Sequence, residues 1–411
     1  MANARHAPRG ALVLGSDYKA LGIVRSLGRH RIPVWVLRDE HLIASCSRYS
    51  ARAVDWPAAD EGARVAFLQA LGRKHRLEAW ALYPTDDETA AFLARNQQEL
   101  GRDFVITTPA WDVLRWAYDK RLTYRAAGDL GIAHPHTHYP QSRADLAAMD
   151  IAYPAILKPA IRTQLNRFTM SKAWRVDDQG SLLARYEEAA ALLDPSLIMV
   201  QELIPGDGAQ QLSYAALCRD GRPIASVVAR RTRQWPMDFG RASTFVETID
   251  DAEVEAIATR MLSALGFTGI VEVEFKRDVR DGKLKLLDIN PRAWGWHSLG
   301  RAAGVDFPYL LWLMLRGEDL PRIRGRAGVR WVRALTDLPT ALGEIRAGRL
   351  SIGAYLLSLR GPIEFAILAA DDPMPAIAEV PAALMLAWRR RTARSAEPPI
   401  PALPSSQRAT R

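Results

Sequence analysis

Cysteine is nearly absent from this 411-residue chain, whose only two cysteines are Cys46 and Cys218. Two cysteines so far apart form neither a disulfide framework nor the ligand spacing of a zinc site. Long apolar runs are also missing, because no stretch reaches the roughly 18 residues that a membrane-spanning helix needs. The first residues lack the charged, apolar and small-residue order of a signal peptide. These absences argue against a secreted or membrane-spanning protein and predict a cytoplasmic one.

Lysine is scarce as well, since only eight of the 55 basic residues are lysines. The net charge is +9, but the segment from Trp388 to Arg411 holds six arginines and one glutamate and so carries more than half of it. The rest of the chain has no basic stripe interleaved with aromatic residues, so we predict no nucleic-acid partner. With 48% hydrophobic and 25% charged residues, the composition is typical of a globular protein of two or three domains.

Strand and helix patterns alternate over residues 11–105. Apolar runs at residues 11–14, 33–37 and 79–83 are each followed by a turn or a polar segment. This alternation predicts a Rossmann-like α/β domain over residues 1–112. The glycine fingerprint G-x-G-x-x-G is absent, which argues against a dinucleotide cofactor. Thr85, with Glu88 three residues later, predicts a capping box at the start of the next helix.

A second feature is the apolar run that ends in Asp288, Asn290 and Arg292 at alternate positions. If residues 284–290 form a strand, these side chains share one side of it. Residues 269–276 read as the partner strand of a hairpin, and they place Glu272 and Glu274 on one face. Carboxylate and carboxamide oxygens suit Mg²⁺, and arginine suits a phosphate that the metal carries. The alternative is a hairpin with one polar, solvated face.

Three more segments carry residues suited to a nucleotide. Lys120 follows an aromatic-rich helical pattern, and Lys158 ends the predicted strand 153–159. A lysine at a strand end can supply a compact positive charge to a phosphate. The predicted strand 197–204 runs into a Pro-Gly turn, so its free backbone edge could hydrogen-bond an adenine. For each segment, an ordinary exposed lysine or an ordinary strand and turn is the alternative.

Taken in chain order, these motifs resemble those of the ATP-grasp superfamily, and within it the carbamoyl-phosphate-synthetase-like carboxylate–amine ligases that include D-aspartate ligase. The resemblance covers residues 113–316, with a small lid lobe over about residues 150–205. The preceding α/β unit is similar to the N-terminal domain of that family. The resemblance therefore implies an α/β (α+β ATP-grasp) fold, in which a Rossmann-like N-terminal domain precedes a two-lobed ATP-grasp module and a helical C-terminal extension.

The resemblance also implies which residues bind ATP. These residues are Lys120, Lys158, Lys172, Gln201, Glu202, Leu203, Ile204 and Gln211. Lys120 and Lys158 would contact the phosphates, and Glu202 with its flanking backbone would hold the adenine. Gln211 stands where relatives often place an acidic ligand of the ribose.

For the metal, the resemblance implies that Glu274, Asp288 and Asn290 bind one or two Mg²⁺ ions, with Mn²⁺ as the alternative. Arg292 would steady the transferred phosphoryl group, so Arg292 and Lys158 are the predicted catalytic residues. Two positions depart from the family pattern. Asp288 replaces the usual glutamate, and residues 162–171 contain no glycine where many relatives have a glycine-rich phosphate lid.

The function that the resemblance implies is a Mg-ATP-dependent ligase that joins a carboxylate to an amine through an acyl phosphate. The departures keep two alternatives open, an ATP-binding regulatory protein without ligase activity and an ATP-grasp kinase of a small molecule. The small-molecule partners would be ATP, a carboxylate and an amine. Arg230, Arg233 and Arg241 are candidate holders of the carboxylate, and a solvated basic face is the alternative for them.

The C-terminal part reads as an addition to this module. Residues 317–328 form a polar linker, residues 329–393 a mainly helical extension, and residues 394–411 a tail that we expect to be disordered. Within the extension, the apolar run 373–388 leads into three arginines. That combination fits contact with an anionic membrane surface. Glu379, the prolines and the modest length favour a packed helix with a solvated basic end.

Overall fold

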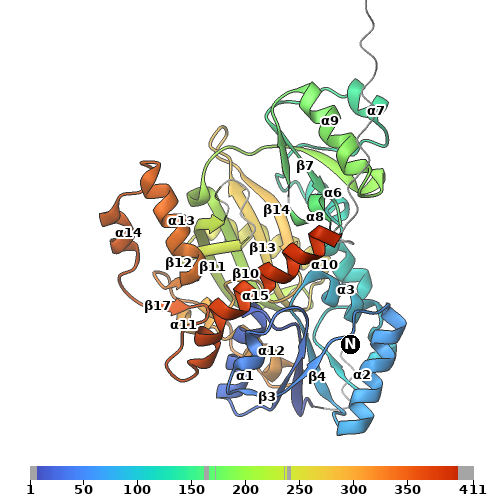
Figure 1. The fold of residues 1–411 in the computed structure, drawn as a ribbon, viewed down its shortest axis with the longest axis vertical. Helices are drawn as coiled ribbons and strands as arrows, with labels where there is room; N and C mark the ends of the chain where they lie inside the picture. The colour runs from blue at the N-terminus through green and yellow to red at the C-terminus, as the bar shows by residue number, and fades with distance from the viewer. Residues whose placement is uncertain (1–6, 162–165, 172, 236, 238–241, 397–411) are drawn as a thin grey trace, which may run out of the picture.

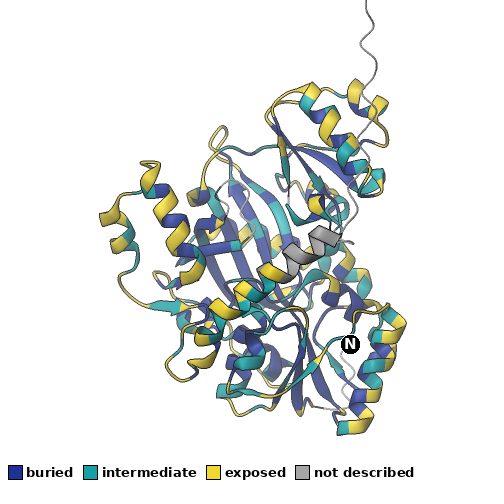
Figure 2. Cartoon of the chain, in the orientation of Figure 1, coloured by how far each residue is buried: buried dark blue, intermediate teal, exposed yellow. Residues whose placement is uncertain are grey.

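The computed structural model describes residues 7–161, 166–171, 173–235, 237 and 242–396, leaving aside the side chains of 387 and 389–396. In these residues the chain forms three β-sheets of five, four and eight strands with helices packed around them (Figure 1). No helix among them combines the length and the apolar character needed to cross a bilayer. The strands are the most deeply buried elements, and the outer faces of the helices are exposed (Figure 2).

The first sheet is parallel and has the order β3-β2-β1-β4-β5. Its strands are β1 Gly10–Leu14, β2 Val34–Arg38, β3 Ser50–Asp55, β4 Trp80–Pro84 and β5 Val105–Ile106. Its helices are α1 Tyr18–Arg29, η1 Ala44–Cys46, α2 Glu61–His75, α3 Asp87–Arg95 and α4 Gln97–Leu100. Both β1 and β4 are fully buried apolar runs, as parallel strands covered on two faces require. The alternation predicted over residues 11–105 is therefore confirmed.

The predicted capping box at Thr85 and Glu88 is wrong by one residue. The N-cap of α3 is Asp86, whose carboxylate accepts from the backbone N–H of Thr89 in a capping box with that residue. Thr85 remains in the sheet, because its buried hydroxyl donates to the carbonyl of Leu14 on the neighbouring strand at 2.6 Å. This tertiary hydrogen bond shifts the helix start by one position.

The second sheet has the order β6-β9-β7-β8 and is antiparallel. The helices α5 Trp111–Tyr118 and α6 Lys120–Asp129 lead into it. Its strands are β6 Thr137–His138, β7 Ala155–Pro159, β8 Trp174–Val176 and β9 Ile198–Glu202. The helices beside it are α7 Arg143–Ala148, α8 Arg167–Met170, α9 Gln179–Ala190 and η2 Pro195–Leu197, whereas η3 Gly208–Gln210 contacts the third sheet. This small lobe has its own apolar core, which includes Leu157, Phe168 and Tyr186.

The third sheet has the order β14-β13-β10-β11-β12-β16-β17, with β15 paired to β11. Its strands are β10 Gln211–Arg219, β11 Arg222–Trp235, β12 Ala242–Ile249, β13 Gly269–Arg277, β14 Leu284–Asn290, β15 Ile323–Arg324, β16 Arg330–Val332 and β17 Ile363–Phe365. The helices around it are α10 Ala252–Leu265, α11 Ser298–Ala303 and α12 Phe307–Leu315. On one face, α10 packs through Val254, Met261 and Leu262.

One apolar cluster joins the first sheet to the third. It contains Leu21 and Val24 of α1 together with Trp294, Trp296 and Phe307, which follow β14. The hydroxyl of Tyr83 also donates to the carbonyl of Pro308 at 3.0 Å. Burial of each large side chain contributes about 1.5–3 kcal/mol, so this cluster holds the N-terminal domain against the end of the β13–β14 hairpin.

The C-terminal extension is joined to the third sheet. Its short strands β16 and β17 extend that sheet beyond β12, which the sequence pattern does not indicate. The helices α13 Ala334–Arg346, α14 Ile352–Ser358 and α15 Met374–Ala396 complete the extension. In Figure 1, α13 and α14 lie at one side of the sheet, and α15 crosses the front of the molecule.

Candidate functional site

A cavity of about 200 Å³ lies where the N-terminal domain meets the β13–β14 hairpin. Its walls come from the starts of α1, α3 and α6, from β11 and β12, from the hairpin, and from residues 292–296. The charged side chains that line it are Lys19, Asp87, Lys120, Arg231, Glu272, Glu274, Asp288 and Arg292. Four acids and four bases thus converge on one small space.

The hairpin register brings the predicted metal ligands together. Glu274 lies opposite Asp288, and Glu272 lies opposite Asn290. The carboxamide of Asn290 donates to Glu272 at 3.0 Å and to Glu274 at 2.9 Å, while its oxygen accepts from Arg292 at 2.9 Å. Glu274, Asp288 and Asn290 therefore face one cavity, as the alternating pattern predicts.

Three cations hold these acids. The Nζ atom of Lys120 lies 2.7 Å from Asp288, and a guanidinium nitrogen of Arg231 lies 2.5 Å from Glu274. Arg292 reaches across to the N-terminal domain, where its Nε atom lies 2.9 Å from Asp87 at the start of α3. Burial opposes the charge of Arg292, but Asp87 and Glu272 outweigh it and raise its pKa. Three of the four acids, Asp87, Glu274 and Asp288, are thus paired with a positive charge of this chain.

Glu272 is the most buried acid of the cavity, with 3% of its surface exposed. It accepts a hydrogen bond from the indole N–H of Trp296 at 2.9 Å. Burial, and then the neighbouring charge of Glu274, raise the pKa of Glu272 to about 7. The two glutamates therefore compete for ionisation, and a cation added to the cavity would relieve that repulsion.

Lys158 reaches this region through a tyrosine. It lies near the end of β7, and its Nζ atom donates to the hydroxyl of Tyr124 at 2.9 Å. That hydroxyl donates in turn to the carbonyl of Leu287, next to Asp288, at 2.8 Å. Burial raises the pKa of Tyr124, which keeps its proton available for this bond. Lys158 is thus connected to the hairpin from the opposite, small-lobe side.

The predicted adenine segment lies at the end of β9, outside the walls of this cavity. The side chain of Gln201 is buried and donates to Thr137 at 2.8 Å. Glu202 accepts from Lys285 at 2.8 Å and from Arg280 at 2.7 Å. The carbonyl of Ile204, after Leu203, accepts from Lys276 at 2.8 Å. The side chains of Gln201 and Glu202 and the carbonyl of Ile204 therefore have partners within the protein, and contact of this segment with a nucleotide stays a prediction.

The other predicted nucleotide residues have different outcomes. Gln211 begins β10 beside Lys276, and its buried Oε1 atom has no hydrogen-bond partner among the described residues. An unpaired buried acceptor is costly, so this atom is suited to a ligand donor. Lys172 lies outside the described residues.

The arginine of β11 that lines the cavity differs from the arginines predicted to hold a carboxylate. Arg233 is buried and makes a bidentate ion pair with Asp337 of α13, so the prediction for it is wrong. Arg230 lies beside Glu247 at 3.8 Å, and Arg241 is outside the described residues. The side chain that reaches the cavity is Arg231. The β11–β12 register shifts between residues 230 and 233, and strand alternation alone does not reveal such a bulge.

The sequence reasoning also missed aromatic and basic residues at the start of α1 and after β14. Tyr18 and Lys19 follow Asp17, the N-cap of α1, at the carboxyl end of β1. Ligands bind at that end of the strands in open α/β sheets. The position of these two residues in the sequence could therefore have indicated that they lie at the site. Trp294 lies in the wall, and its indole N–H is buried without a hydrogen-bond partner in the described part of the chain. This unpaired donor points to an acceptor group on a ligand.

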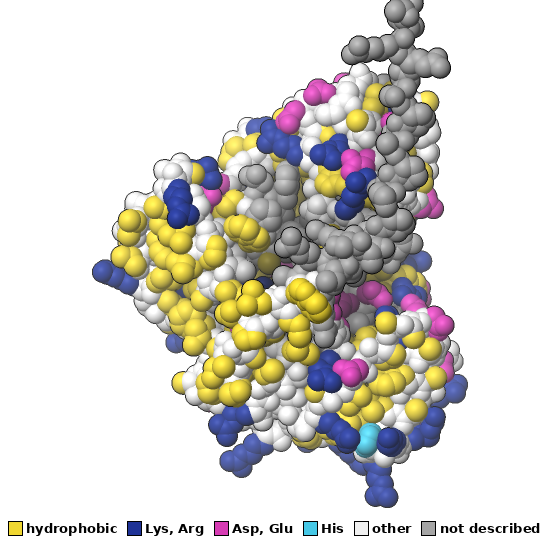
Figure 3. Space-filling model, viewed as in Figure 1, with side chains coloured by type: hydrophobic (Ala, Val, Ile, Leu, Met, Phe, Trp, Pro, Cys, Tyr) yellow, Lys and Arg dark blue, Asp and Glu magenta, His cyan; other side chains and the backbone are white. Residues whose placement is uncertain are grey.

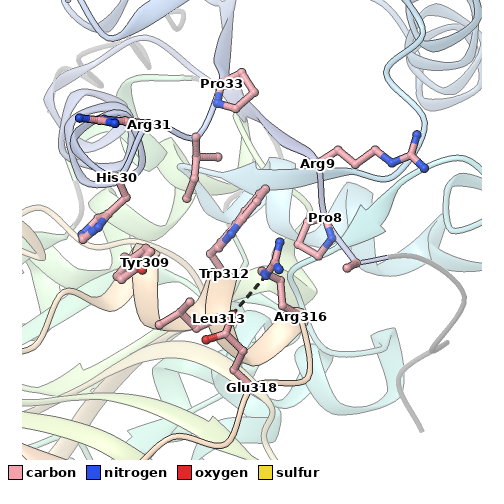
Figure 4. Close-up of a pocket in the computed structure, with 12 residues that line it drawn as sticks. Pro8, Arg9, His30, Arg31, Pro33, Tyr309, Trp312, Leu313, Arg316 and Glu318 are labelled. Carbon is pink, nitrogen blue, oxygen red and sulfur yellow. Dashed lines mark hydrogen bonds and ion pairs between the residues drawn. The ribbon is translucent and has the colours of Figure 1, made fainter.

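A larger and more open cavity of about 650 Å³ lies elsewhere, between the start of the chain and α12 (Figure 4). Arg9, Arg31 and Arg316 reach it, and Arg316 pairs with Glu318. All four of these charged side chains are exposed. Its lining contains the single carboxylate of Glu318 and none of the predicted site residues. The hairpin cavity is therefore the better candidate for the functional site.

Comparison with known proteins gives one family match. Residues 195–335 match the family described as "ATP-grasp in the biosynthetic pathway with Ter operon". A D-alanine–D-alanine ligase of Xanthomonas axonopodis pv. citri is 31% identical over 185 residues, which cover 41% of this chain and 54% of the ligase. The chain therefore spans about half the length of this curated relative.

Solved structures share the fold at low sequence identity. An L-amino acid ligase from Bacillus licheniformis has 17% identity and a TM-score of 0.58, with 75% of each chain covered. The biotin carboxylase domain of 2-oxoglutarate carboxylase from Hydrogenobacter thermophilus, in complex with MgADP and bicarbonate, has 16% identity and a TM-score of 0.61. That match covers 78% of this chain and 73% of the other.

Proposed function

We propose that this chain is a Mg-ATP-dependent ligase that joins a carboxylate to an amine through an acyl phosphate, and the match of residues 195–335 to an ATP-grasp family supports the proposal. The observation that carries the proposal is the hairpin cavity, where Glu274, Asp288 and Asn290 meet Lys120 and Arg292. The similarity to a D-alanine–D-alanine ligase supports the same class of reaction.

The residues present fit Mg²⁺. Mg²⁺ binds through one or two carboxylates and completes its octahedral shell with water and substrate phosphates. Among the described residues, no group of three or more His, Cys, Asp or Glu side chains forms a complete protein cage. Glu274, Asp288 and the oxygen of Asn290 offer the smaller set that such a shared shell needs, and we propose them as its ligands. The same oxygens suit Mn²⁺.

When bound, Mg²⁺ would neutralise phosphate charge and polarise the transferred phosphoryl group. The chain's own residues supply the rest of the chemistry. Lys120 and Lys158 approach from two sides of the hairpin and would bind the phosphate oxygens. Arg292 would stabilise the charge that builds up during transfer, since the step needs positioning and neutralisation more than a nucleophilic side chain.

The nucleotide would lie between the small lobe and the third sheet. We propose that the end of β9, from Gln201 to Ile204, holds the adenine and that Gln211 binds the ribose. The carboxylate substrate attacks the γ-phosphorus of ATP, so ADP leaves and an acyl phosphate forms. The amine then attacks the acyl carbon and displaces phosphate.

The two unpaired cysteines support a reducing, cytoplasmic location.

The test is ADP release by the purified protein with Mg-ATP, hydroxylamine and pools of small carboxylates. Hydroxylamine replaces the unknown amine and traps an acyl phosphate as a hydroxamate. We expect ADP and hydroxamate that both depend on one pool. Asp288→Asn and Lys158→Ala should each lower the rate by about 100-fold or more.

Asp281→Asn is the matched control, because Asp281 is an exposed carboxylate in the turn of the same hairpin. It should keep full activity. Normal turnover by Asp288→Asn would disprove the site assignment. ADP without hydroxamate would identify a kinase, and ATP binding without either product would favour a regulatory protein.

A further inference from the structure

The exposed apolar side chains of this protein are concentrated on its C-terminal extension. Thirteen of the sixteen large apolar side chains that are exposed in the described part of the chain lie between Leu335 and Trp388. Single exposed apolar residues are normal, but a large contiguous patch marks an interaction site. The extension therefore carries a surface that its own fold leaves uncovered.

Helix α15 contributes the longest part of this surface. Met374, Ile377, Val380, Leu384 and Trp388 recur at intervals of three and four residues and are 51–68% exposed. This spacing places them on one face of the helix. The opposite face packs on the core through small side chains, since Ala376 and Ala382 contact the cluster shared by the first and third sheets. The predicted packed helix is present, but its larger apolar side chains point outward.

Helices α13 and α14 continue the apolar surface. On α13 the exposed residues are Leu335, Leu338 and Leu342, and on α14 they are Ile352, Leu356 and Leu357. Figure 3 looks onto this face, where hydrophobic side chains gather over α13 and α14 and over the first part of α15. We call the exposed apolar residues of α13, α14 and α15, together with the arginines that flank them in the sequence, the apolar–basic face.

The extension also carries an excess of positive charge. Residues 329–396 contain nine arginines and six acidic residues. All six acids are engaged in ion pairs, and they are Asp337, Glu344, Glu364, Asp371, Asp372 and Glu379. Arg346 and Arg360 are exposed beside α13 and α14. Four more arginines, at 389, 390, 391 and 394, follow the apolar stripe in the sequence of α15.

We propose that the apolar–basic face docks on an anionic lipid surface. Apolar side chains on one face of a helix enter the boundary between headgroups and acyl chains, and arginines reach the anionic headgroups from the flanks. A second copy of this chain would bring the excess positive charge of two extensions together, whereas an anionic membrane neutralises it. The proposal is independent of the ligase reaction, because the face lies on helices that do not line the hairpin cavity.

The test is flotation of the full chain with vesicles of equal parts phosphatidylcholine and phosphatidylglycerol, and with vesicles of phosphatidylcholine alone. We expect binding to the anionic vesicles that weakens with added salt, and at least tenfold weaker binding to the neutral ones. The double variant Ile377→Ser/Leu384→Ser should lose at least tenfold in affinity. Replacement of Arg389, Arg390 and Arg391 by glutamine should have a similar effect.

Val279→Ser is the matched control, since Val279 is 59% exposed but lies in the turn of the β13–β14 hairpin. This variant should bind vesicles as the parent does. Failure of the parent chain to bind anionic vesicles, or full binding by Ile377→Ser/Leu384→Ser, would overturn the proposal. Self-association that the double variant abolishes, without vesicle binding, would assign the face to a second copy instead.

Discussion

At the scale of single residues, burial sets the charge state of a histidine that follows the last residue of the cavity wall. His297, directly after Trp296, is 2% exposed. Its Nδ1 atom lies 2.8 Å from the carbonyl of Trp294, an acceptor, so Nδ1 carries the proton. The Nε2 atom is buried without a hydrogen-bond partner in the described residues. Burial lowers the pKa of His297 to about 4, so the ring is neutral in the folded protein at pH 7.

This histidine predicts a pH dependence of stability. Between pH 6.5 and 4 the unfolded chain binds a proton at His297 and the folded chain does not, so stability falls as the pH falls. The contribution is about 3 kcal/mol in total, at 1.36 kcal/mol for each pKa unit. His297→Asn keeps a donor for the Trp294 carbonyl and cannot titrate. Urea unfolding should show this variant less stable at pH 7 and nearer to the parent at pH 4. A difference that does not change with pH would contradict the prediction.

At the scale of elements, β11 connects the cavity to the extension. Arg231 points to Glu274 in the cavity, and Arg233, two residues on, is held by Asp337 of α13. Both partners of the second pair are buried, with Asp337 at 0% and Arg233 at 4% exposure, and Thr244 of β12 donates to the same carboxylate at 2.9 Å. The helix α13 is thus fixed to two strands by one buried carboxylate.

Asp337→Ala should therefore be strongly destabilising, because it leaves the guanidinium of Arg233 buried without its counter-ion. We expect a loss of about 3–5 kcal/mol in the free energy of unfolding. The double variant Arg233→Met/Asp337→Leu removes both charges and should lie much closer to the parent. Chemical denaturation of the three proteins measures the difference. Equal losses in the single and double variants would show that shape, and not the unpaired charge, sets the cost.

At the scale of the whole molecule, the end of the extension is tied to the first helix of the chain. Asp372 is fully buried and accepts from Arg25 of α1 at 2.9 Å and from Ser47 at 2.7 Å. Asp371 next to it accepts from Arg29 and Tyr49 at the surface. These contacts link residues more than 300 positions apart and position α15 over the N-terminal domain.

Asp372→Asn should weaken this tie much more than Asp371→Asn. The first change removes the charge that balances a buried arginine, for which we expect a loss of about 3 kcal/mol. The second concerns an exposed pair, which contributes about 1 kcal/mol or less. Hydrogen exchange of the backbone in residues 374–386 should rise in Asp372→Asn and stay near the parent in Asp371→Asn. The reverse order would show that the surface pair is the anchor.

The sequence by itself determined most of the elements and which acidic side chains share one face of the hairpin. The alternation in residues 11–105 and the hairpin pattern around Asp288 and Asn290 depend on local periodicity, which a single sequence shows directly. The same periodicity indicates that Glu274 can meet Asp288 across the hairpin, because both side chains fall on one face of the paired strands. Arg292 continues the same alternation past Pro291, whereas Lys120 was predicted only through the resemblance to the ATP-grasp superfamily.

Only the tertiary structure decided which charges meet. Arg231 rather than Arg233 faces the carboxylates because a bulge changes the register of β11, and Lys19 reaches the cavity because the apolar cluster around Trp294 packs α1 against the hairpin. The sequence also did not show that the large apolar side chains of α15 face outward, because this too depends on tertiary packing. An amphipathic pattern shows that a helix has an apolar face, but only the packing of Ala376 and Ala382 shows that this face is not the buried one.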